Sequence, residues 1–173
     1  MVKNIVIVGL DRDITRPVAE ILAEQLQMHF LDTIELFEFD HIPRSLSEIL
    51  VEQKEKYYRK KEVNIMRYAS GFENTVIHSE SGFVLEEDTT KIIKQNCLLI
   101  YLYLPAKRVK ENISKKVYKD DAIRRFFNIS LAKIEKRHEI LNKCCDIKVN
   151  VADKSVLKIV SGLIRAMDKY FTF

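Results

Sequence analysis

Short runs of apolar and β-branched residues alternate along this chain with longer segments of helical periodicity. The runs lie at residues 4–8, 75–77, 97–104 and 146–151. Runs that lack polar alternation are typical of strands buried on both faces, as in a parallel sheet. Apolar residues at helical spacing occupy residues 18–28, 131–141 and 156–167. This alternation predicts a three-layer α/β fold, in which helices cover both faces of a central parallel sheet of about five strands.

The length of the chain, 173 residues, suits one domain with one sizeable core. It contains only four glycines and three prolines, and no stretch has the composition of a linker, a repeat or a low-complexity region. We therefore expect residues 1–173 to form a single domain.

The charge and the apolar runs argue against two classes of partner. The net charge of +4 comes with lysines spread along the chain, whereas nucleic-acid binding normally requires a concentrated basic patch. The apolar run at residues 97–105 is far shorter than a membrane span. Three cysteines are too few, and odd in number, for a disulfide framework, which indicates a reducing compartment. We expect a cytoplasmic protein that binds neither nucleic acid nor membrane.

In such a fold, ligands bind beyond the carboxyl ends of the strands, so the turn after the first strand is the first candidate site. It begins at Gly9, and its length matches a phosphate-binding loop of the form G-x-x-x-x-G-K-[ST]. Ile14, Thr15 and Arg16 replace the last three residues of that pattern. The turn therefore lacks the glycine that lets backbone N–H groups surround phosphate, the lysine that reaches it and the hydroxyl that holds magnesium.

The same turn carries two acidic residues, Asp11 and Asp13, where phosphate groups would lie. Like charges about 4 Å apart repel by about 4 kcal/mol at an effective dielectric constant of about 20, so these carboxylates disfavour phosphate. Arg12 and Arg16 could offset part of this charge. Two interpretations stay open: a plain connection from strand to helix, or an unusual anion site built from Arg12, Arg16 and the helix N-terminus.

Six segments, in order over nearly the whole chain, carry the motifs of one known family. After the opening strand, loop and helix up to residue 23, they are Phe30-Leu-Asp-Thr-Ile34, Glu55-Lys-Tyr-Tyr-Arg-Lys-Lys-Glu62, Val76-Ile-His-Ser-Glu-Ser-Gly82, Leu99-Ile-Tyr-Leu-Tyr-Leu104 and Arg137-His-Glu-Ile-Leu-Asn-Lys-Cys-Cys-Asp146. In the same order, the first two of these five segments resemble the motifs F-[IV]-D-[ST]-D and G-E-x-x-F-R-x-x-E, and Lys54 stands at the glycine of the second motif. The third and fourth resemble a strand that ends in G-G-G and the strand that follows it. The fifth resembles R-x-P-L-Y-x-x-x-A-D. The set resembles the shikimate kinase family, which implies a P-loop kinase fold and a role in aromatic amino acid biosynthesis.

The resemblance implies roles for four residues. Asp32 lies at the position of the aspartate that helps to hold magnesium, and it is the one catalytic candidate. Arg59 and Arg137 lie at the positions of the two arginines that bind the shikimate carboxylate. Gly82 is the one glycine retained from the triplet beside the substrate. Ile34 replaces the family's second aspartate, and an isoleucine cannot accept a proton.

Two further features bear on these roles. Glu55 and Glu62 lie four and three residues from Arg59 on a predicted helix, so Arg59 also has a structural interpretation as an ion-pair residue. The mobile lid of the family should lie at residues 113–129, which contain an Arg-Arg pair but lack the family's R-P-L-L pattern.

Three functions are compatible with these observations. The first is a shikimate-kinase-like protein that does not transfer phosphate from ATP, needs no cofactor and keeps a pocket for a small carboxylate such as shikimate. The second is an active shikimate or related small-molecule kinase with a remodelled phosphate site, which would use ATP and magnesium. The third is a protein-interaction domain without a small ligand, with the aromatic end at residues 170–173 as its contact. The lost loop residues and the lost base favour the first.

Overall fold

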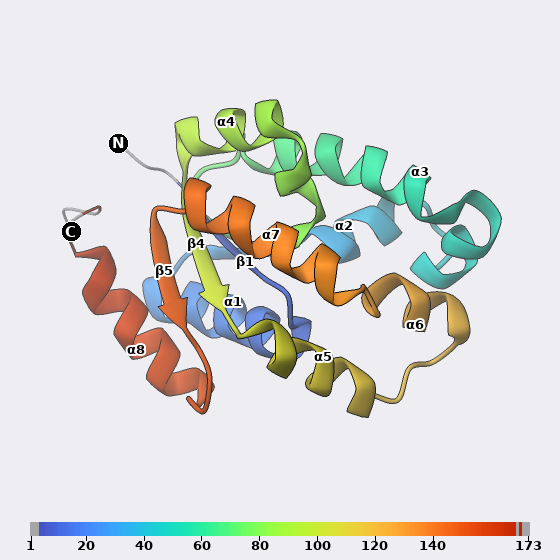
Figure 1. Cartoon of the computed structure of the whole chain (residues 1–173). Coiled ribbons are helices and arrows are strands. Elements are labelled where there is room, and N and C mark those ends of the chain that lie inside the picture. The colour runs from blue at the N-terminus through green and yellow to red at the C-terminus, as the bar shows by residue number, and fades with distance from the viewer. Residues whose placement is uncertain (1–3, 169, 171–173) are drawn as a thin grey trace.

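The computed structural model describes residues 4–168 and Tyr170. Five parallel strands form one sheet in the order β2-β3-β1-β4-β5. The strands are β1 (Asn4–Gly9), β2 (His29–Asp32), β3 (Thr75–Glu80), β4 (Cys97–Tyr103) and β5 (Ile147–Asn150). Because all of them run the same way, their carboxyl ends meet at one edge of the sheet (Figure 1).

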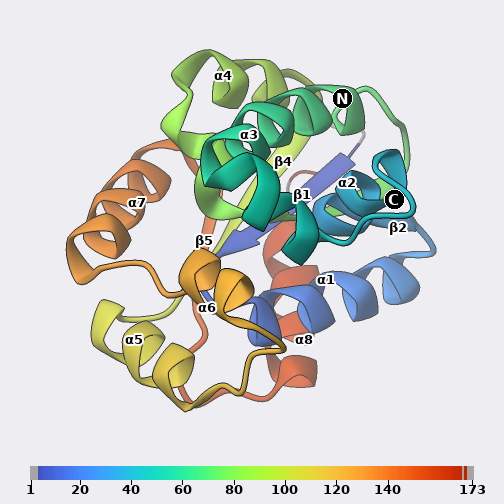
Figure 2. The same ribbon diagram turned by 90° about the vertical axis from the view of Figure 1, so that its right-hand side faces the viewer.

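Helices cover both faces of this sheet, which confirms the predicted three-layer α/β fold (Figure 1, Figure 2). The helices are α1 (Arg12–Leu26), α2 (Thr33–Asp40), α3 (Leu46–Ala69), α4 (Glu87–Asn96), α5 (Ala106–Lys115), α6 (Asp121–Phe127), α7 (Leu131–Cys144) and α8 (Val156–Met167), with a 3-10 helix η1 (Ser81–Leu85). Helices α1 and α8 pack on one face, and α3, α4 and α7 pack on the other. Within the described residues, no helix is long and apolar enough to cross a membrane.

Strand β1 lies at the centre of the sheet, and all of its residues are buried. Successive side chains of a strand point to opposite faces. Ile5 and Ile7 belong to the core beneath α1 and α8, whereas Val6 and Val8 belong to the core beneath α3, α4 and α7. This burial on both faces explains why the strand appears in the sequence as a continuous apolar run.

Four of the strands coincide with apolar runs in the sequence, and α1, α7 and α8 coincide with the segments of helical periodicity. The runs do not predict β2. This strand is only four residues long and lies at the edge of the sheet, where His29 is exposed. An edge strand with exposed residues lacks the continuous apolar run that marks a central strand.

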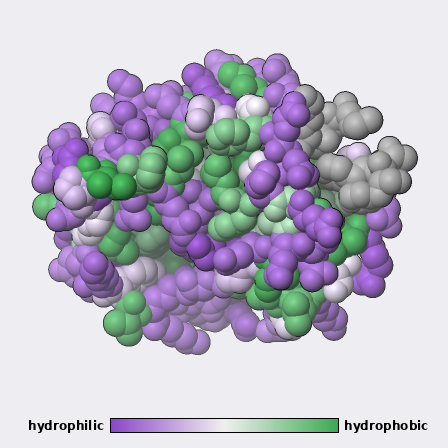
Figure 3. Space-filling view, turned by 180° about the vertical axis from the view of Figure 1, so that it is seen from behind, coloured by the Kyte–Doolittle hydropathy of each residue, from purple (hydrophilic) through white to green (hydrophobic). Residues whose placement is uncertain are grey.

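The protein contact expected at the aromatic end of the chain falls mostly on residues outside the described part. On the face shown in Figure 3, hydrophobic residues form small groups among hydrophilic ones. The structure describes Tyr170, whose hydroxyl donates to the carbonyl oxygen of Asp146 at 3.3 Å. The rest of the aromatic end, residues 171–173, lies outside the described part of the chain.

Helix α3 is interrupted at Lys54, whose backbone φ of 63° and ψ of 168° are not helical. Glycine adopts this conformation readily, whereas a Cβ makes it cost about 1–3 kcal/mol. The motif that this segment resembles has glycine at the same position. The part of α3 beyond the kink carries Arg59, so the kink lies one to two helical turns before a residue expected at the ligand.

Lys54→Gly is expected to raise the free energy of unfolding by about 1 kcal/mol, because relief of backbone strain exceeds the added entropy of the unfolded chain. Lys54→Ala is the matched control, since it shortens the side chain but keeps the Cβ. Urea denaturation of the three proteins measures the difference. A glycine variant no more stable than the alanine variant would show that the backbone is unstrained at this position.

Candidate functional site

Helix α1 begins at Arg12, so most of the turn that matches a phosphate-binding loop in length is helical. Asp11 caps the helix, because its side chain accepts a hydrogen bond from the backbone N–H of Asp13 at 3.3 Å. The backbone N–H groups of Ile14 and Thr15 both donate to the carbonyl oxygen of Asp11, each at 3.0 Å. Donors that a phosphate-binding loop presents to its ligand are therefore used within the helix.

Gly9 is required here for close packing. A Cβ at this position would lie 2.5 Å from Cγ2 of Thr15 and 2.9 Å from the carbonyl oxygen of Leu102. None of the glycines within residues 4–168 has a positive φ. Gly9 thus does not supply the left-handed backbone from which anion-binding turns are commonly built.

The two carboxylates of this turn are neutralised by a lysine from far along the chain. Nζ of Lys116 lies 2.7 Å from Oδ1 of Asp11 and 3.0 Å from Oδ2 of Asp13. The side-chain amide of Asn112 donates to Oδ2 of Asp11 at 2.8 Å. Arg12 and Arg16, which could have offset part of this charge, pair instead with other carboxylates.

Arg12 and Arg16 converge on Asp32 at the end of β2. Nη2 of Arg12 lies 2.8 Å, and Nε of Arg16 lies 3.3 Å, from Oδ2 of Asp32. Nη1 of Arg12 also lies 3.2 Å from Oε1 of Glu80 at the end of β3, and Nη2 of Arg16 lies 2.5 Å from Oε1 of Glu35. The two arginines therefore join α1 to α2 and to the ends of two strands.

Both oxygens of Asp32 are occupied, and its side chain has no exposed surface. Oδ1 accepts the backbone N–H groups of Ile34 and Glu35, at 2.9 and 3.3 Å, and thereby caps α2. Oδ2 accepts hydrogen bonds from Arg12 and from Nδ1 of His78, at 2.8 and 2.9 Å. Burial would raise the pKa of Asp32, but the hydrogen bond from His78 and the charge of Arg12 outweigh it and hold the pKa at about 2.

His78 connects Asp32 to Thr15, the residue at the position of the phosphate-loop lysine. Nε2 of His78 lies 2.8 Å from the hydroxyl of Thr15. When Nδ1 carries the proton and donates it to Asp32, Nε2 accepts the hydroxyl proton of Thr15, so both ring nitrogens are satisfied. We call Arg12, Thr15, Asp32, His78 and Glu80 the strand-end cluster. The polar side chains of this cluster are thus hydrogen-bonded to one another.

Arg59 of α3 forms both ion pairs that its helix spacing predicts. It pairs with Glu55 at 3.0 Å and with Glu62 at 3.0 Å. Its guanidinium lies over the ring of Phe126 on α6, with Cζ 4.7 Å from the ring centroid. The charge of Arg59 is therefore balanced within α3.

Gly82 and Arg137 lie in the same region as this ion pair. A Cβ on Gly82 would overlap Nη1 of Arg59 and Oε2 of Glu62, so a larger residue at this position would have to displace the ion pair of Arg59 and Glu62. Nη1 of Arg137 donates to the hydroxyl of Ser81 at 3.1 Å. Burial and the nearby charge of Arg59 lower the pKa of Arg137, and no carboxylate of the described chain forms an ion pair with it. The structure thus brings the three predicted substrate residues together, and Arg137 keeps an unpaired charge.

Glu62 is a site residue for which the sequence suggested only an ion-pair role. It is 1% exposed, and its Oε1 has no hydrogen-bond partner among the described residues. Burial raises the pKa of Glu62 to about 7, an effect larger than the opposite effect of the Arg59 charge. The available signal was its place as the last residue of the G-E-x-x-F-R-x-x-E motif.

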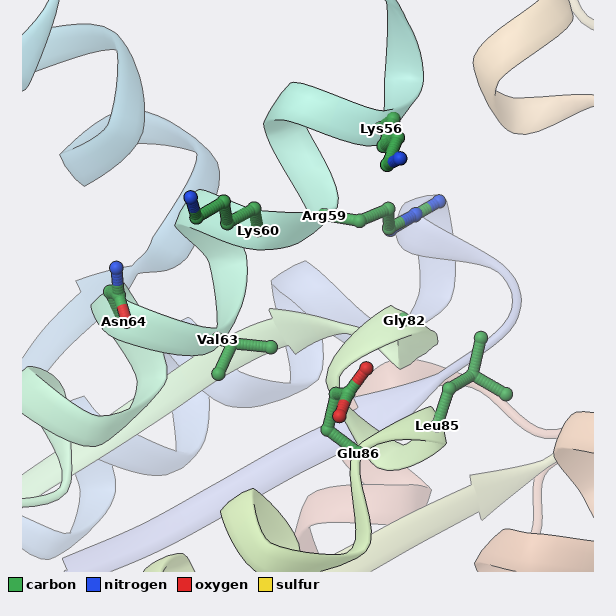
Figure 4. A pocket seen from close by; sticks show the side chains of 8 residues that line it. All are labelled: Lys56, Arg59, Lys60, Val63, Asn64, Gly82, Leu85 and Glu86. Atoms are coloured by element: carbon green, nitrogen blue, oxygen red, sulfur yellow. The ribbon is translucent and has the colours of Figure 1, made fainter.

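A pocket of about 410 Å³ opens beside Arg59 and Gly82, between α3 and η1 (Figure 4). Its other lining residues are Lys56, Lys60, Val63 and Asn64 of α3, together with Leu85 and Glu86. In Figure 4 the side chains of Lys56 and Arg59 lie at one end of the pocket, and that of Lys60 extends in the opposite direction.

Comparison with known proteins assigns this fold to one family. The sequence profile described as shikimate kinase matches residues 16–168. The chain belongs to the shikimate kinase family. The shikimate kinase of Alkaliphilus oremlandii is 28% identical over 167 residues, which cover 95% of this chain and 98% of that protein. The shikimate kinase of Caldanaerobacter subterraneus is 29% identical over 174 aligned residues, which cover 96% and 97%.

Solved shikimate kinase structures share the fold. The enzyme from Acinetobacter baumannii, in complex with shikimate, has a TM-score of 0.80 at 16% identity and covers 100% of this chain and 97% of its own. The enzyme from Aquifex aeolicus has a TM-score of 0.77 at 22% identity, with coverage of 96% and 97%. The expected P-loop kinase fold is therefore confirmed.

The segment expected as the shikimate kinase lid, residues 113–129, includes the end of α5, a loop and α6. Lys116 holds the start of the loop to the turn after β1. Phe126 packs against α3, which lies next to α6 in Figure 2. Arg124 pairs with Asp121 in its own helix, at 2.9 Å. The contact from this segment to the phosphate-loop region is therefore made by lysine rather than by the Arg-Arg pair.

Arg12→Met is expected to lower the free energy of unfolding by about 3 kcal/mol, because Glu80 would lose the arginine with which it pairs and Asp32 would lose the nearer of its two arginines. Adding Asp32→Asn should restore part of this loss, since asparagine keeps the cap on α2 without the charge. Arg108→Met is the control, because its pair with Asp153 is exposed and should contribute at most about 1 kcal/mol. Urea denaturation measures all four proteins, and equal losses for both arginines would contradict the importance of the strand-end cluster.

Proposed function

We propose that this member of the shikimate kinase family binds a small hydroxylated carboxylate such as shikimate and does not transfer phosphate from ATP. The observation that carries the proposal is the ion pair between Arg12 and Asp32. It occupies the position at which the family is expected to hold magnesium. The charged residues of the nucleotide side are paired with one another. On the acceptor side, Arg137 is buried without an acidic partner in the described chain.

The phosphates of ATP do not fit the residues of the turn after β1. The N–H groups of Ile14 and Thr15 are hydrogen-bonded inside α1. The carboxylates of Asp11 and Asp13 add negative charge, which repels phosphate. Lys116, the lysine nearest to the turn, already pairs with both acids. Phosphate binding would therefore require several of these interactions to break at once.

A magnesium ion does not fit at Asp32 either. Its oxygens are occupied by the backbone of α2, by His78 and by Arg12, and its side chain has no exposed surface. Arg16 stands at the position of the metal-binding hydroxyl. We therefore expect neither nucleotide nor metal as a cofactor.

The acceptor side supports carboxylate binding. Arg137 offers a buried guanidinium without an ion-pair partner among the described residues, and Gly82 packs against the guanidinium of Arg59. A guanidinium that is partly desolvated binds a carboxylate strongly and with two parallel hydrogen bonds. The structurally similar enzyme from Acinetobacter baumannii is in complex with shikimate, which supports a hydroxylated carboxylate as the ligand.

An active small-molecule kinase with a remodelled phosphate site is the second candidate. It is favoured by relatives named shikimate kinase that match nearly the whole chain. Phosphoryl transfer depends mainly on positioning and electrostatic stabilisation, which Arg12 and Arg16 could supply at the strand ends. For this role Arg12 would have to leave Asp32 and Glu80, and buried carboxylates without a partner are costly.

Isothermal titration calorimetry with shikimate, with ATP and Mg²⁺, and with both together separates these candidates. We expect shikimate to bind without nucleotide, ATP with Mg²⁺ not to bind, and no shikimate to be phosphorylated. Arg137→Met should weaken shikimate binding roughly 30-fold or more, because a buried charge-assisted pair is lost. Arg108→Met is the control and should leave the affinity unchanged, since its ion pair with Asp153 is on the exposed surface.

Saturable binding of ATP with Mg²⁺, together with turnover of shikimate, would establish the active kinase instead. If the folded protein bound none of these molecules, both small-molecule functions would be contradicted. A protein-interaction domain would then be the function left to test.

A further inference from the structure

The pocket in Figure 4 is lined by two lysines without an ion-pair partner among the described residues, in addition to Arg59 of the proposed carboxylate site. Arg59 lines this pocket, but Glu55 and Glu62 balance its charge. Lys56 and Lys60 line it too, and neither has an ion-pair partner among the described residues. The positive charge available to a ligand in this pocket therefore comes from the two lysines.

The two lysines lie one helical turn apart on the exposed side of α3. Residues four positions apart on a helix have Cβ atoms about 6 Å from each other. In Figure 4 the side chain of Lys56 reaches to the end of the pocket where Arg59 lies, whereas that of Lys60 extends toward the Asn64 end. The charges thus mark two separate places along one pocket rather than a single anion site.

The rest of the lining suits the body of a small organic molecule. Val63 and Leu85 provide apolar contact, and Gly82 provides backbone without a side chain. Glu86 is the one carboxylate among the lining residues, so two unpaired lysines face a single acid. The volume of about 410 Å³ lies within the range of small-ligand sites.

We propose that this pocket binds a small organic dianion, with one anionic group beside Lys56 and Arg59 and a second beside Lys60. The proposal rests on the proposed carboxylate-binding function, because the pocket shares Arg59 and Gly82, although not Arg137, with the proposed carboxylate site. The G-E-x-x-F-R-x-x-E motif leaves the positions of both lysines unspecified, so the motif does not imply the second anion-binding position.

Two ring acids test the proposal by calorimetry, with shikimate as a third ligand. Cyclohexanecarboxylate and trans-cyclohexane-1,4-dicarboxylate carry one and two anionic groups on the same ring. We expect the dicarboxylate to bind about fivefold more tightly at low ionic strength, the scale of one good exposed ion pair. About 0.5 M NaCl should reduce this difference, because salt screens exposed charges.

Lys60→Gln should remove the preference for the dicarboxylate and leave the affinity for the monocarboxylate unchanged. Lys61→Gln is the matched control for net charge. Its Nζ lies 5.8 Å from the ring centroid of Tyr57, and Lys61 does not line the pocket. Because Lys60 is exposed on a helix, its replacement should not affect folding.

Binding of the two ring acids tests the dianion site, and binding of shikimate tests the proposed carboxylate function separately. Equal affinities for the two ring acids, or equal effects of Lys60→Gln and Lys61→Gln, would overturn the dianion site. Binding of shikimate in the same experiment would then still uphold the carboxylate function. If none of the three acids bound, both proposals would be overturned.

Discussion

A buried ion pair holds the carboxyl ends of the strands together at the ligand side of this sheet. Arg12 joins Asp32 at the end of β2 to Glu80 at the end of β3, and the side chain of Asp32 has no exposed surface. A buried carboxylate without a partner is costly, so the surrounding backbone must keep these groups in contact. Asp32 also caps α2, and through His78 and Thr15 it is linked to the first turn of α1. The positions of both helices thus depend on the same charges.

These charges divide the ligand side of the sheet into two unlike halves. In the half that the resemblance relates to the nucleotide site, Asp11 pairs with Lys116. In the strand-end cluster, Arg12 pairs with Asp32 and Glu80. In the acceptor half, Arg137, Lys56 and Lys60 have no ion-pair partner among the described residues. A cation without an ion-pair partner can bind an anionic ligand directly, whereas a cation in an ion pair must first separate from its carboxylate. The proposed loss of ATP binding and the proposed binding of carboxylates are thus two consequences of one charge distribution.

Much of the architecture could be predicted because burial leaves a pattern in the sequence. Central strands are buried on both faces and appear as apolar runs, whereas the short edge strand β2 (His29–Asp32) does not. The motifs also identified Arg59, Gly82 and Arg137, which the fold brings into one region. The partners of the charged residues could not be predicted. Arg16 follows two acids in the sequence, yet its side chain pairs with residues of β2 and α2.

By itself the sequence determined four of the five strands and the helices α1, α7 and α8, because periodicity records which residues are buried. It also places Ile14, Thr15 and Arg16 in the turn after the first strand, and these residues are the basis for predicting an altered phosphate-binding loop. Only the tertiary structure decided which charges neutralise one another. Lys116 and Asp11 are 105 residues apart in the chain and meet only because the sheet brings its carboxyl ends to one edge. Electrostatic energy depends on distance in space, and separation along the sequence carries little information about that distance.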